Sequence, residues 1–545
     1  MKRRNFLKLT STASALSLLP MEVFALFKSA GMTSCPDING KKLVLIQLAG
    51  ANDGINTVVP LNQYYTYAAL RPKIKLSNSG ANGVINLDTT LSIENQVGLH
   101  PTLTGFKSLY DSGLMRLVQG VGYPSQDKSH FKSTDLWLTG GDGTQANNFL
   151  DSGWVGRFLE NYYGNFLTAT FPLGIQLGSS ENSLGFHGEE EHGMSINING
   201  QDPSGFYSVV NGLGGPAPTT IPNSEYGDLI KYILDNDTST NIYAQSISKA
   251  FSSGTNSITY PNTNLSNQLK TVAKFISGGL ETKVYLVKIG GFDTHNLQVS
   301  GASTPHIGKH AELLTEISEA ISNFVTDLKN QSIDKDVLAV TFSEFGRKAG
   351  ENGGLGTDHG EIAPMFVFGS AITPGVSGTN INLGEAVSSN NFQVKTVQHD
   401  YRRVFSTILQ DWFGASNAIL DLTFYDKTNF TGFSSKKVSQ LINAQNLIAP
   451  SCYTDTALEN KNFTTNNNEI IVYSNPKSES FTVHSIENIN SITIYNIDGK
   501  LIRKFNNPLT TNQYSFPVDT LSVGIYNLLI NTNQGNYPKK IIVRR

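Results

Sequence analysis

The chain has 545 residues, a net charge of −3 and 16% charged residues, which is enough material for one large domain and a small one. The near-neutral charge and the lack of long basic runs argue against nucleic acid as a partner. A small anionic substrate at a locally positive metal site stays compatible with this composition.

The N-terminus begins with Met1-Lys2-Arg3-Arg4-Asn5-Phe6-Leu7-Lys8, and a weakly apolar stretch rich in Ser, Thr, Ala and Leu follows. Paired arginines before Phe-Leu-Lys resemble a twin-arginine export signal, which is an address and not part of the fold. The apolar stretch is too short and too hydroxylated to span a bilayer, which needs about 20 apolar residues. We therefore expect residues 1–34 to be a leader read by the twin-arginine machinery, and we expect no transmembrane segment.

The two cysteines, Cys35 and Cys452, bracket the large central region. An oxidising compartment would permit a disulfide between them. Two unpaired thiols are equally compatible with the sequence.

Strand-like apolar runs alternate with helical patterns over the central region, residues 35–452. The clearest helix is expected over residues 306–328, where apolar residues recur every three or four positions. It lies between strands expected at 284–289 and 337–341. This βαβ spacing predicts an α/β domain with a mostly parallel sheet covered by helices.

The pattern of apolar and polar residues changes beyond about residue 460. Residues 453–468 read as a linker, and short alternating runs at hairpin spacing follow. They predict a separate β-sandwich over residues 469–545, with strands at 469–473, 480–484, 491–495, 501–505, 524–531 and 539–543.

Candidate metal ligands follow three of the central strands. Because the carboxyl ends of parallel strands meet at one edge of a sheet, we expect them to converge on one site. Carboxylates and imidazoles from several strands are what a divalent cation requires, with zinc expected first and calcium, magnesium or manganese as alternatives. The expected ligands are Asp53, Asp293, His295, Glu344 and His359, with Asp358 a weaker sixth candidate.

Ser129 is expected at the start of a helix, where backbone N–H groups favour an anion and could help the serine to act as a nucleophile. Simple capping of the helix is compatible with the same position. Arg347 and Lys132 are candidate anion clamps, and Arg347 is preferred because its planar fork suits phosphate or sulfate oxygens.

The central region resembles a bacterial family of unknown function, DUF1501, which is often exported by the twin-arginine route and is a distant relative of alkaline phosphatases and sulfatases. The resemblance covers residues of about 43–445. The segments that carry it are 49–60, 99–101, Ser129-His130-Phe131, Gly291-Phe292-Asp293-Thr294-His295, Ser343-Glu344-Phe345-Gly346-Arg347 and Gly356-Thr357-Asp358-His359-Gly360.

The resemblance to alkaline phosphatases implies two metals. Asp293, His295 and His359 would hold the first. The second would be held by Asp53, Glu344 and Ser129.

Two departures from that pattern leave open a one-metal site, a different metal or no metal. Glu344-Phe345 replaces an Asp-His dipeptide, so the second metal loses an imidazole unless His130 supplies it. The spacing of Asp293 and His295 is tighter than in the phosphatases. The Cys/Ser-x-Pro-x-Arg motif of sulfatases is absent from the sequence.

The tail resembles the C-terminal sorting domain of the type IX secretion system of Bacteroidetes. Its matching segments are Val472-Tyr473-Ser474-Asn475-Pro476, 494–500, 521–526 and the basic ending 539–543. The resemblance implies an address for crossing the outer membrane. A carbohydrate-binding sandwich is the alternative.

Together these features predict an exported metal-dependent hydrolase at the cell surface or outside the cell. Its substrate would be a phosphate or sulfate ester, either a small anionic ester or a sulfated or phosphorylated polymer. Ser129, His130 and Arg347 would carry the chemistry. The alternative is a non-catalytic surface or envelope binding protein that retains the fold, which Glu344-Phe345 favours.

Overall fold

The computed structural model describes residues 35–144, 152–163, 170–178, 183–188, 195–198, 243–424 and 438–455, and most of 470–543. The predicted leader, residues 1–34, lies outside the described residues, as does the predicted linker from residue 456 on. The chain divides into two compact units, Met1–Asn460 and Lys461–Arg545.

The first unit is built on a nine-stranded sheet with the order β11-β5-β10-β9-β1-β8-β6-β7, in which β12 also pairs with β5. All neighbouring strands are parallel except β10, which runs antiparallel between β9 and β5. The strands are β1 Lys42–Leu48, β5 Met115–Gly122, β6 Gly174–Leu177, β7 Ser195–Ile198, β8 Val284–Ile289, β9 Val337–Phe342, β10 Ala363–Phe368, β11 Gly375–Ser377 and β12 His399–Asp400.

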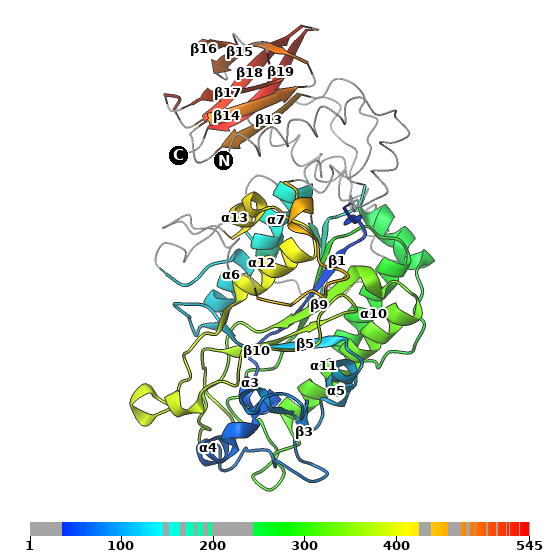
Figure 1. The fold of residues 1–545 in the computed structure, drawn as a ribbon, viewed down its shortest axis with the longest axis vertical. Coiled ribbons are helices and arrows are strands. Elements are labelled where there is room, and N and C mark those ends of the chain that lie inside the picture. Colours follow the sequence, from blue (N-terminus) through cyan, green and yellow to red (C-terminus); the bar gives the residue numbers. More distant parts are fainter. Residues whose placement is uncertain are drawn as a thin grey trace, which may run out of the picture. The chain divides into compact units, whose positions relative to one another are not determined.

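Helices cover both faces of this sheet (Figure 1). One face packs against α5 (Thr104–Asp111), α10 (Asn264–Ser277) and α11 (Lys309–Asn330), and the other against α6 (His130–Thr139), α7 (Trp154–Tyr163), α12 (Tyr401–Asp411) and α13 (Asn417–Thr423). Alternate residues of β1 enter the two cores: Leu43 and Leu45 on one side, Val44 and Ile46 on the other. A strand buried on both faces is apolar throughout, which is why β1 reads as a continuous hydrophobic run.

The predicted α/β class is confirmed, and the predicted strands 284–289 and 337–341 correspond to β8 and β9. The helix expected from residue 306 begins at Lys309 instead. Gly308 has φ +124°, outside the helical region, so the helix can start only after it. Ile307, expected on the buried face, is 47% exposed for the same reason.

A small antiparallel sheet lies beside the main one, formed by β2 (Val58–Pro60), β4 (Val97–Leu99) and β3 (Ile85–Asn86). The short helices α3 (Gly54–Thr57) and α4 (Tyr64–Leu70) flank β2 in the sequence. A disulfide joins Cys35 to Cys452 across 417 positions of sequence. Of the two alternatives compatible with the sequence, a disulfide and two unpaired thiols, the structure has the disulfide.

The second unit contains two antiparallel sheets with the orders β13-β14-β17 and β16-β15-β18-β19. Phe481 and Phe516 of the first sheet share one hydrophobic core with Ile492 and Leu528 of the second, as in a sandwich. The strands are β13 Ile470–Asn475, β14 Ser480–Ser485, β15 Ile489–Asn496, β16 Leu501–Asn506, β17 Gln513–Pro517, β18 Gly524–Thr532 and β19 Asn536–Val543. All but β17 overlap a strand predicted from the sequence.

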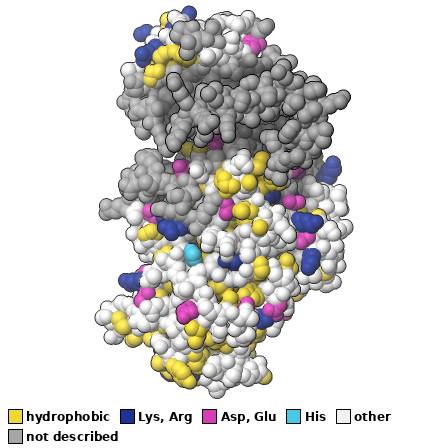
Figure 2. All heavy atoms as spheres, viewed as in Figure 1, with side chains coloured by type: hydrophobic (Ala, Val, Ile, Leu, Met, Phe, Trp, Pro, Cys, Tyr) yellow, Lys and Arg dark blue, Asp and Glu magenta, His cyan; other side chains and the backbone are white. Residues whose placement is uncertain are grey.

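On the face drawn in Figure 2, acidic and basic side chains of the described residues are interspersed. Among the helices that the structure describes, none combines the length and apolar character needed to cross a membrane.

Candidate metal centre

Three neighbouring parallel strands, β9, β1 and β8, end at one edge of the sheet. The loop after β8 carries Asp293 and His295, and the loop after β9 carries Glu344 and Arg347. His359 precedes β10, and because β10 is antiparallel to β9, its start lies where β9 ends. The expectation that candidate residues meet at this edge therefore has a direct basis in the topology.

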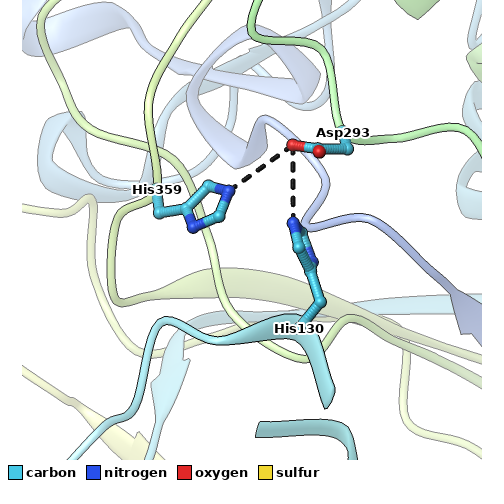
Figure 3. Close-up of side chains that lie close together, drawn as sticks. All are labelled: His130, Asp293 and His359. Atoms are coloured by element: carbon cyan, nitrogen blue, oxygen red, sulfur yellow. Dashed lines mark ion pairs between the residues drawn. The ribbon is translucent and has the colours of Figure 1, made fainter. Parts of the chain in front are cut away.

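The N-terminal residue of α6, His130, enters the same site from the far side of β10. Its Nε2 lies 3.5 Å from Oδ1 of Asp293, and Nε2 of His359 also lies 3.5 Å from that oxygen. Figure 3 shows the two imidazoles pointing toward the Asp293 carboxylate. Ligand atoms of His130, Asp293 and His359 all lie within 4.8 Å of one another, a group of the kind that can hold a metal ion.

A third imidazole contacts the same carboxylate oxygen: Nε2 of His295 lies 3.2 Å from Oδ1 of Asp293. Ligands at 2.0–2.1 Å from a tetrahedral zinc ion are separated by about 3.3–3.4 Å from one another. The three nitrogen-to-oxygen distances of 3.2–3.5 Å are close to that separation, and the group of ligand atoms that all lie within 4.8 Å of one another comprises His130, Asp293 and His359.

The opposite ring nitrogen of each histidine is held by an oxygen. The pairs are His130 Nδ1 with Glu344 Oε1 at 2.7 Å, His295 Nδ1 with Asp358 Oδ1 at 3.2 Å, and His359 Nδ1 with the Lys128 carbonyl at 2.8 Å. Carbonyl and carboxylate oxygens accept, so each Nδ1 is a donor and a neutral ring presents its Nε2 lone pair to the site. Metal-bound histidines in proteins are oriented in this way.

Three polar atoms at the site are buried and have no hydrogen-bond partner among the described residues: Nε2 of His130, Nε2 of His359 and Oε2 of Glu344. Buried polar groups are almost always satisfied, so such a group calls for an explanation. Lone pairs on two nitrogens facing a carboxylate oxygen repel one another unless a cation lies between them. The donor set therefore fits a divalent cation.

The charges of the site follow from its contacts. The hydrogen bond from His130 to Glu344 raises the pKa of His130 above its ordinary value, whereas burial lowers the pKa of His359. Burial alone would raise the pKa of Asp293, but the hydrogen bond and charge of Arg347 outweigh it, so the pKa of Asp293 is lowered. The pKa of Asp358 is lowered to about 2, chiefly by a hydrogen bond from Asn352, which keeps it anionic beside His295.

Arg347 does not serve as the anion clamp expected from the sequence. Its side chain is 0% exposed, so a substrate oxygen cannot reach it. Its guanidinium donates to Asp293 Oδ1 at 2.7 Å and to the carbonyls of Gly50, Ala51, Phe292 and Thr357. Arg347 thus joins the strand-end loops to one another and holds the Asp293 carboxylate. The second candidate clamp, Lys132, forms an ion pair with Asp127 at 3.3 Å.

The structure also places Asp53 outside the ligand cluster. Arg71 donates to both of its oxygens, at 2.6 and 2.9 Å, and Gln298 donates to Oδ2 at 2.6 Å. Burial opposes ionisation of Asp53, but Arg71 outweighs it and lowers the pKa to about 2. The buried guanidinium of Arg71 neutralises the charge of Asp53. Asp53 therefore supports the residues around the ligand cluster and is not itself one of the ligands. No motif in the sequence singles out Arg71 or Gln298.

Glu344 is hydrogen-bonded to Nδ1 of His130. It therefore orients that imidazole, whereas the sequence predicted it as a direct metal ligand. Its Oε1 accepts from Gly50 N at 2.8 Å as well as from His130, and its side chain is 2% exposed. The next residue, Phe345, is 1% exposed, and its ring centroid lies 4.8 Å from those of both His130 and His359. An apolar ring therefore supports the two imidazoles at the position where the phosphatase pattern has a histidine.

Ser129 is exposed and precedes α6, as expected, and its side chain makes no capping hydrogen bond. Its neighbours on both sides contact the site: the carbonyl of Lys128 accepts from His359, and His130 faces Asp293. Ser129 therefore lies on the rim of the cluster.

Backbone strain gathers in the loops around the site. Ala51, Leu297 and Leu355 have φ of +65°, +51° and +58°, which residues with side chains seldom adopt. Gly50 at φ +112° approaches the loop after β8 so closely that a Cβ would lie 2.4 Å from Asp293 N. Strained positions persist where surrounding contacts over-determine them, and they are common at functional sites.

Several solved structures are similar to this chain, each at 10% identity. They are the lipoteichoic acid synthase LtaP from Listeria monocytogenes (63% of this chain and 71% of that chain, TM-score 0.28), a protein in the alkaline phosphatase superfamily from Vibrio parahaemolyticus (92% and 82%, TM-score 0.30), and the PsFucS1 sulfatase from Pseudoalteromonas sp. (88% and 84%, TM-score 0.28). These low identities and TM-scores carry no argument about activity. No curated protein matches the chain.

Two family models match separate parts of the sequence. The model described as "Secretion system C-terminal sorting domain" matches residues 471–544, and the model described as "Protein of unknown function (DUF1501)" matches residues 278–418. The latter range contains the loops that carry Asp293, His295, Glu344 and His359. Both resemblances predicted from the sequence are therefore confirmed over these residues, to DUF1501 for the centre of the chain and to the secretion sorting domain for its tail.

Proposed function

We propose that the protein is an exported metal-dependent hydrolase of phosphate or sulfate esters. The observation that carries the proposal is the approach of three imidazole Nε2 atoms to one carboxylate oxygen, at distances of 3.2–3.5 Å. Asp293, His295 and His359 would hold the cation together with His130. A divalent cation bound there would offset the negative charge that develops on the ester oxygens.

The donor set supports one cation per chain. A second site would need Asp53, whose two oxygens are already bound by Arg71 and Gln298. It would also need an imidazole where Phe345 packs. Imidazole-rich sites with one carboxylate suit zinc better than calcium or magnesium, which prefer oxygen ligands.

Ser129 is the proposed nucleophile, because it is exposed on the rim of the cluster and immediately precedes a ten-residue helix whose N-terminal N–H groups favour an anion. Its Oγ attacks the phosphorus or sulfur atom, the alcohol oxygen leaves with the bonding electron pair, and the serine proton passes to that oxygen through solvent. Water then releases phosphate or sulfate and restores Ser129. His130, the next residue, would be a ligand of the cation.

The experiment measures metal content and turnover together, on protein purified without added metal. We expect one zinc ion per chain and hydrolysis of an aryl phosphate or aryl sulfate. Two metal ions per chain would contradict the single centre. The absence of both metal and turnover would overturn the proposal that the protein is a hydrolase.

A non-catalytic binding protein is the second candidate, favoured by the burial of Arg347, whose guanidinium is paired with Asp293 and cannot hold a substrate anion. Under that reading the protein binds metal and an anionic ester or polymer without cleaving it. Metal-loaded protein that retains a sulfated or phosphorylated polymer but hydrolyses no ester would decide for it.

The sorting-domain match supports export to the cell surface or the medium. We further propose that residues 1–34 direct the first step through the twin-arginine machinery. Changing Arg3 and Arg4 to Lys should keep the protein in the cytoplasm, whereas deleting residues 469–545 should leave it in the periplasm. Surface display of the shortened form would contradict the role of the tail.

A further inference from the structure

Two threonines lie among the candidate ligands and point into the protein. Thr294 stands between Asp293 and His295 and is 2% exposed, and Thr357 stands two positions before His359 and is 0% exposed. Both hydroxyls donate to a single acceptor, Oε1 of Gln298, at 3.1 and 3.0 Å. A carbonyl oxygen has two lone pairs, so this oxygen is saturated by one hydroxyl from each ligand-bearing loop.

The other end of the Gln298 amide is anchored in the interior. Its Nε2 donates to Asp53 Oδ2 at 2.6 Å, and Arg71 holds Asp53 from the opposite side. Arg71 in turn donates to the carbonyls of Lys348 and Ala349 at 2.7 and 2.9 Å. A carboxylate can only accept, so the amide nitrogen must face Asp53 and the amide oxygen must face the threonines.

Because these residues are buried, each of them depends on its partners in the protein for its hydrogen bonds. Gln298, Asp53 and Arg71 are each 0% exposed, so water cannot replace a lost partner. A buried polar group left without its partner costs about 1–3 kcal/mol. The backbone adds a second connection between the same loops, because Gln298 N donates to the Leu355 carbonyl at 3.0 Å.

We propose that Gln298 is a positioning residue of the metal centre, which sets the separation between the loop of His295 and the loop of His359 through Thr294 and Thr357. The inference rests on the proposed function, since it assigns a purpose to the spacing of two of that site's ligands. It also gives Asp53, first expected as a ligand, the role of anchoring the amide that spaces the ligands.

The test uses Thr294→Val together with Thr357→Val, which keeps side-chain shape and removes both hydroxyls. The rescue variant is Thr294→Ser with Thr357→Ser, which restores them. Thr423→Val is the matched control, because Thr423 is also 0% exposed and its hydroxyl makes one hydrogen bond, to the Ile419 carbonyl, in α13. Thermal unfolding of each variant verifies that it is folded.

Cobalt(II) alone is the probe, because its visible absorption reports coordination geometry without any substrate. We expect the double valine variant to bind cobalt about 10–100-fold more weakly, the range seen when partners of metal ligands are removed, and to show an altered spectrum. The double serine variant should recover both properties, and Thr423→Val should leave both unchanged. Unaltered affinity and spectrum in the double valine variant would overturn the role of Gln298.

A second readout separates this inference from the proposed function. In metal-free protein labelled at histidine, the ring resonances of His295 and His359 should shift in the double valine variant and return in the double serine variant. If the wild-type protein binds no cobalt, the metal centre fails, and the resonances alone decide on Gln298: unchanged shifts in a folded double valine variant reject the inference, and shifts reversed by serine uphold it.

Discussion

Glu344 Oε1 lies 2.7 Å from Nδ1 of His130, and this bond joins the loop after β9 to the first residue of α6. The same oxygen accepts from Gly50 N, so the imidazole is oriented by a carboxylate that is itself fixed by the loop after β1. The contact holds Nε2 of His130 toward Asp293. The contact therefore makes His130, which follows none of the three central strands, part of the metal centre.

Glu344→Gln tests that orientation. The amide keeps the size of the side chain but removes the negative charge that favours an Nδ1–H donor and a basic Nε2. We expect zinc affinity to fall by about tenfold or more, with little change in the melting temperature. Competition with a chromophoric chelator measures the affinity, and Glu361→Gln, which alters the partly exposed ion pair with the Lys128 side chain, is the matched control. Equal affinities in the two variants would contradict a role for Glu344 at the metal.

Two buried histidines beneath the site predict loss of stability in acid. Burial is the largest cause that lowers the pKa of His100 to about 3 and that of His310 to about 4, while the unfolded chain titrates near 6.5. A depressed folded-state pKa means that the stabilising contribution is complete above pH 6.5 and is lost as the pH falls toward 4 and then 3. Each histidine contributes a slope of up to about 1.4 kcal/mol per pH unit in that window.

Urea unfolding at pH 7, 5.5 and 4.5 measures this dependence. His310→Gln should flatten it, because one of the two groups no longer binds a proton on unfolding. An identical pH dependence in wild type and His310→Gln would contradict the neutral buried state of His310.

Much of the fold and part of the site could be predicted from the sequence, for a physical reason. Apolar runs that end in Gly and carboxylate residues are local signals, so β8 and β9 and the loops after them could be predicted. The position of β10 and the pairing of Asp53 with Arg71 depend on contacts between distant segments, which no local pattern encodes. His130 is predicted from the sequence as a residue of the chemistry and as a substitute ligand, because a histidine in a helix N-terminus has many roles.

Missed elements have similar explanations. The strand β17, Gln513-Tyr514-Ser515-Phe516-Pro517, lacks the β-branched residues that mark strands, and its place is set by pairing with β14. The sequence predicts Arg347 as an anion clamp because its planar fork suits phosphate or sulfate oxygens and because it follows Glu344 closely. The acceptors that consume its donors are backbone carbonyls, which a sequence does not display.

The disulfide predicts a dependence of stability on oxidation. A bridge across 417 positions restricts the unfolded chain strongly, and removal of a native disulfide commonly costs about 2–5 kcal/mol. Cys35→Ser with Cys452→Ser should therefore lower the urea midpoint of the first unit, and dithiothreitol should lower that of the wild type to the same value. A wild-type midpoint unaffected by reductant would show that the bridge contributes nothing to stability.

Ser129→Ala and His359→Ala separate chemistry from metal binding. Ser129 makes no side-chain capping hydrogen bond, so its loss should leave α6 and the metal content intact while turnover of aryl phosphate or sulfate is abolished. His359→Ala removes a proposed ligand whose Nδ1 is held by the Lys128 carbonyl, so it should lower the metal content itself. Metal analysis and turnover are measured on the same preparations, with the exposed Ser125→Ala as the control for Ser129. Full activity in Ser129→Ala would move the attack to water, and unchanged metal content in His359→Ala would remove the foundation of the metal centre.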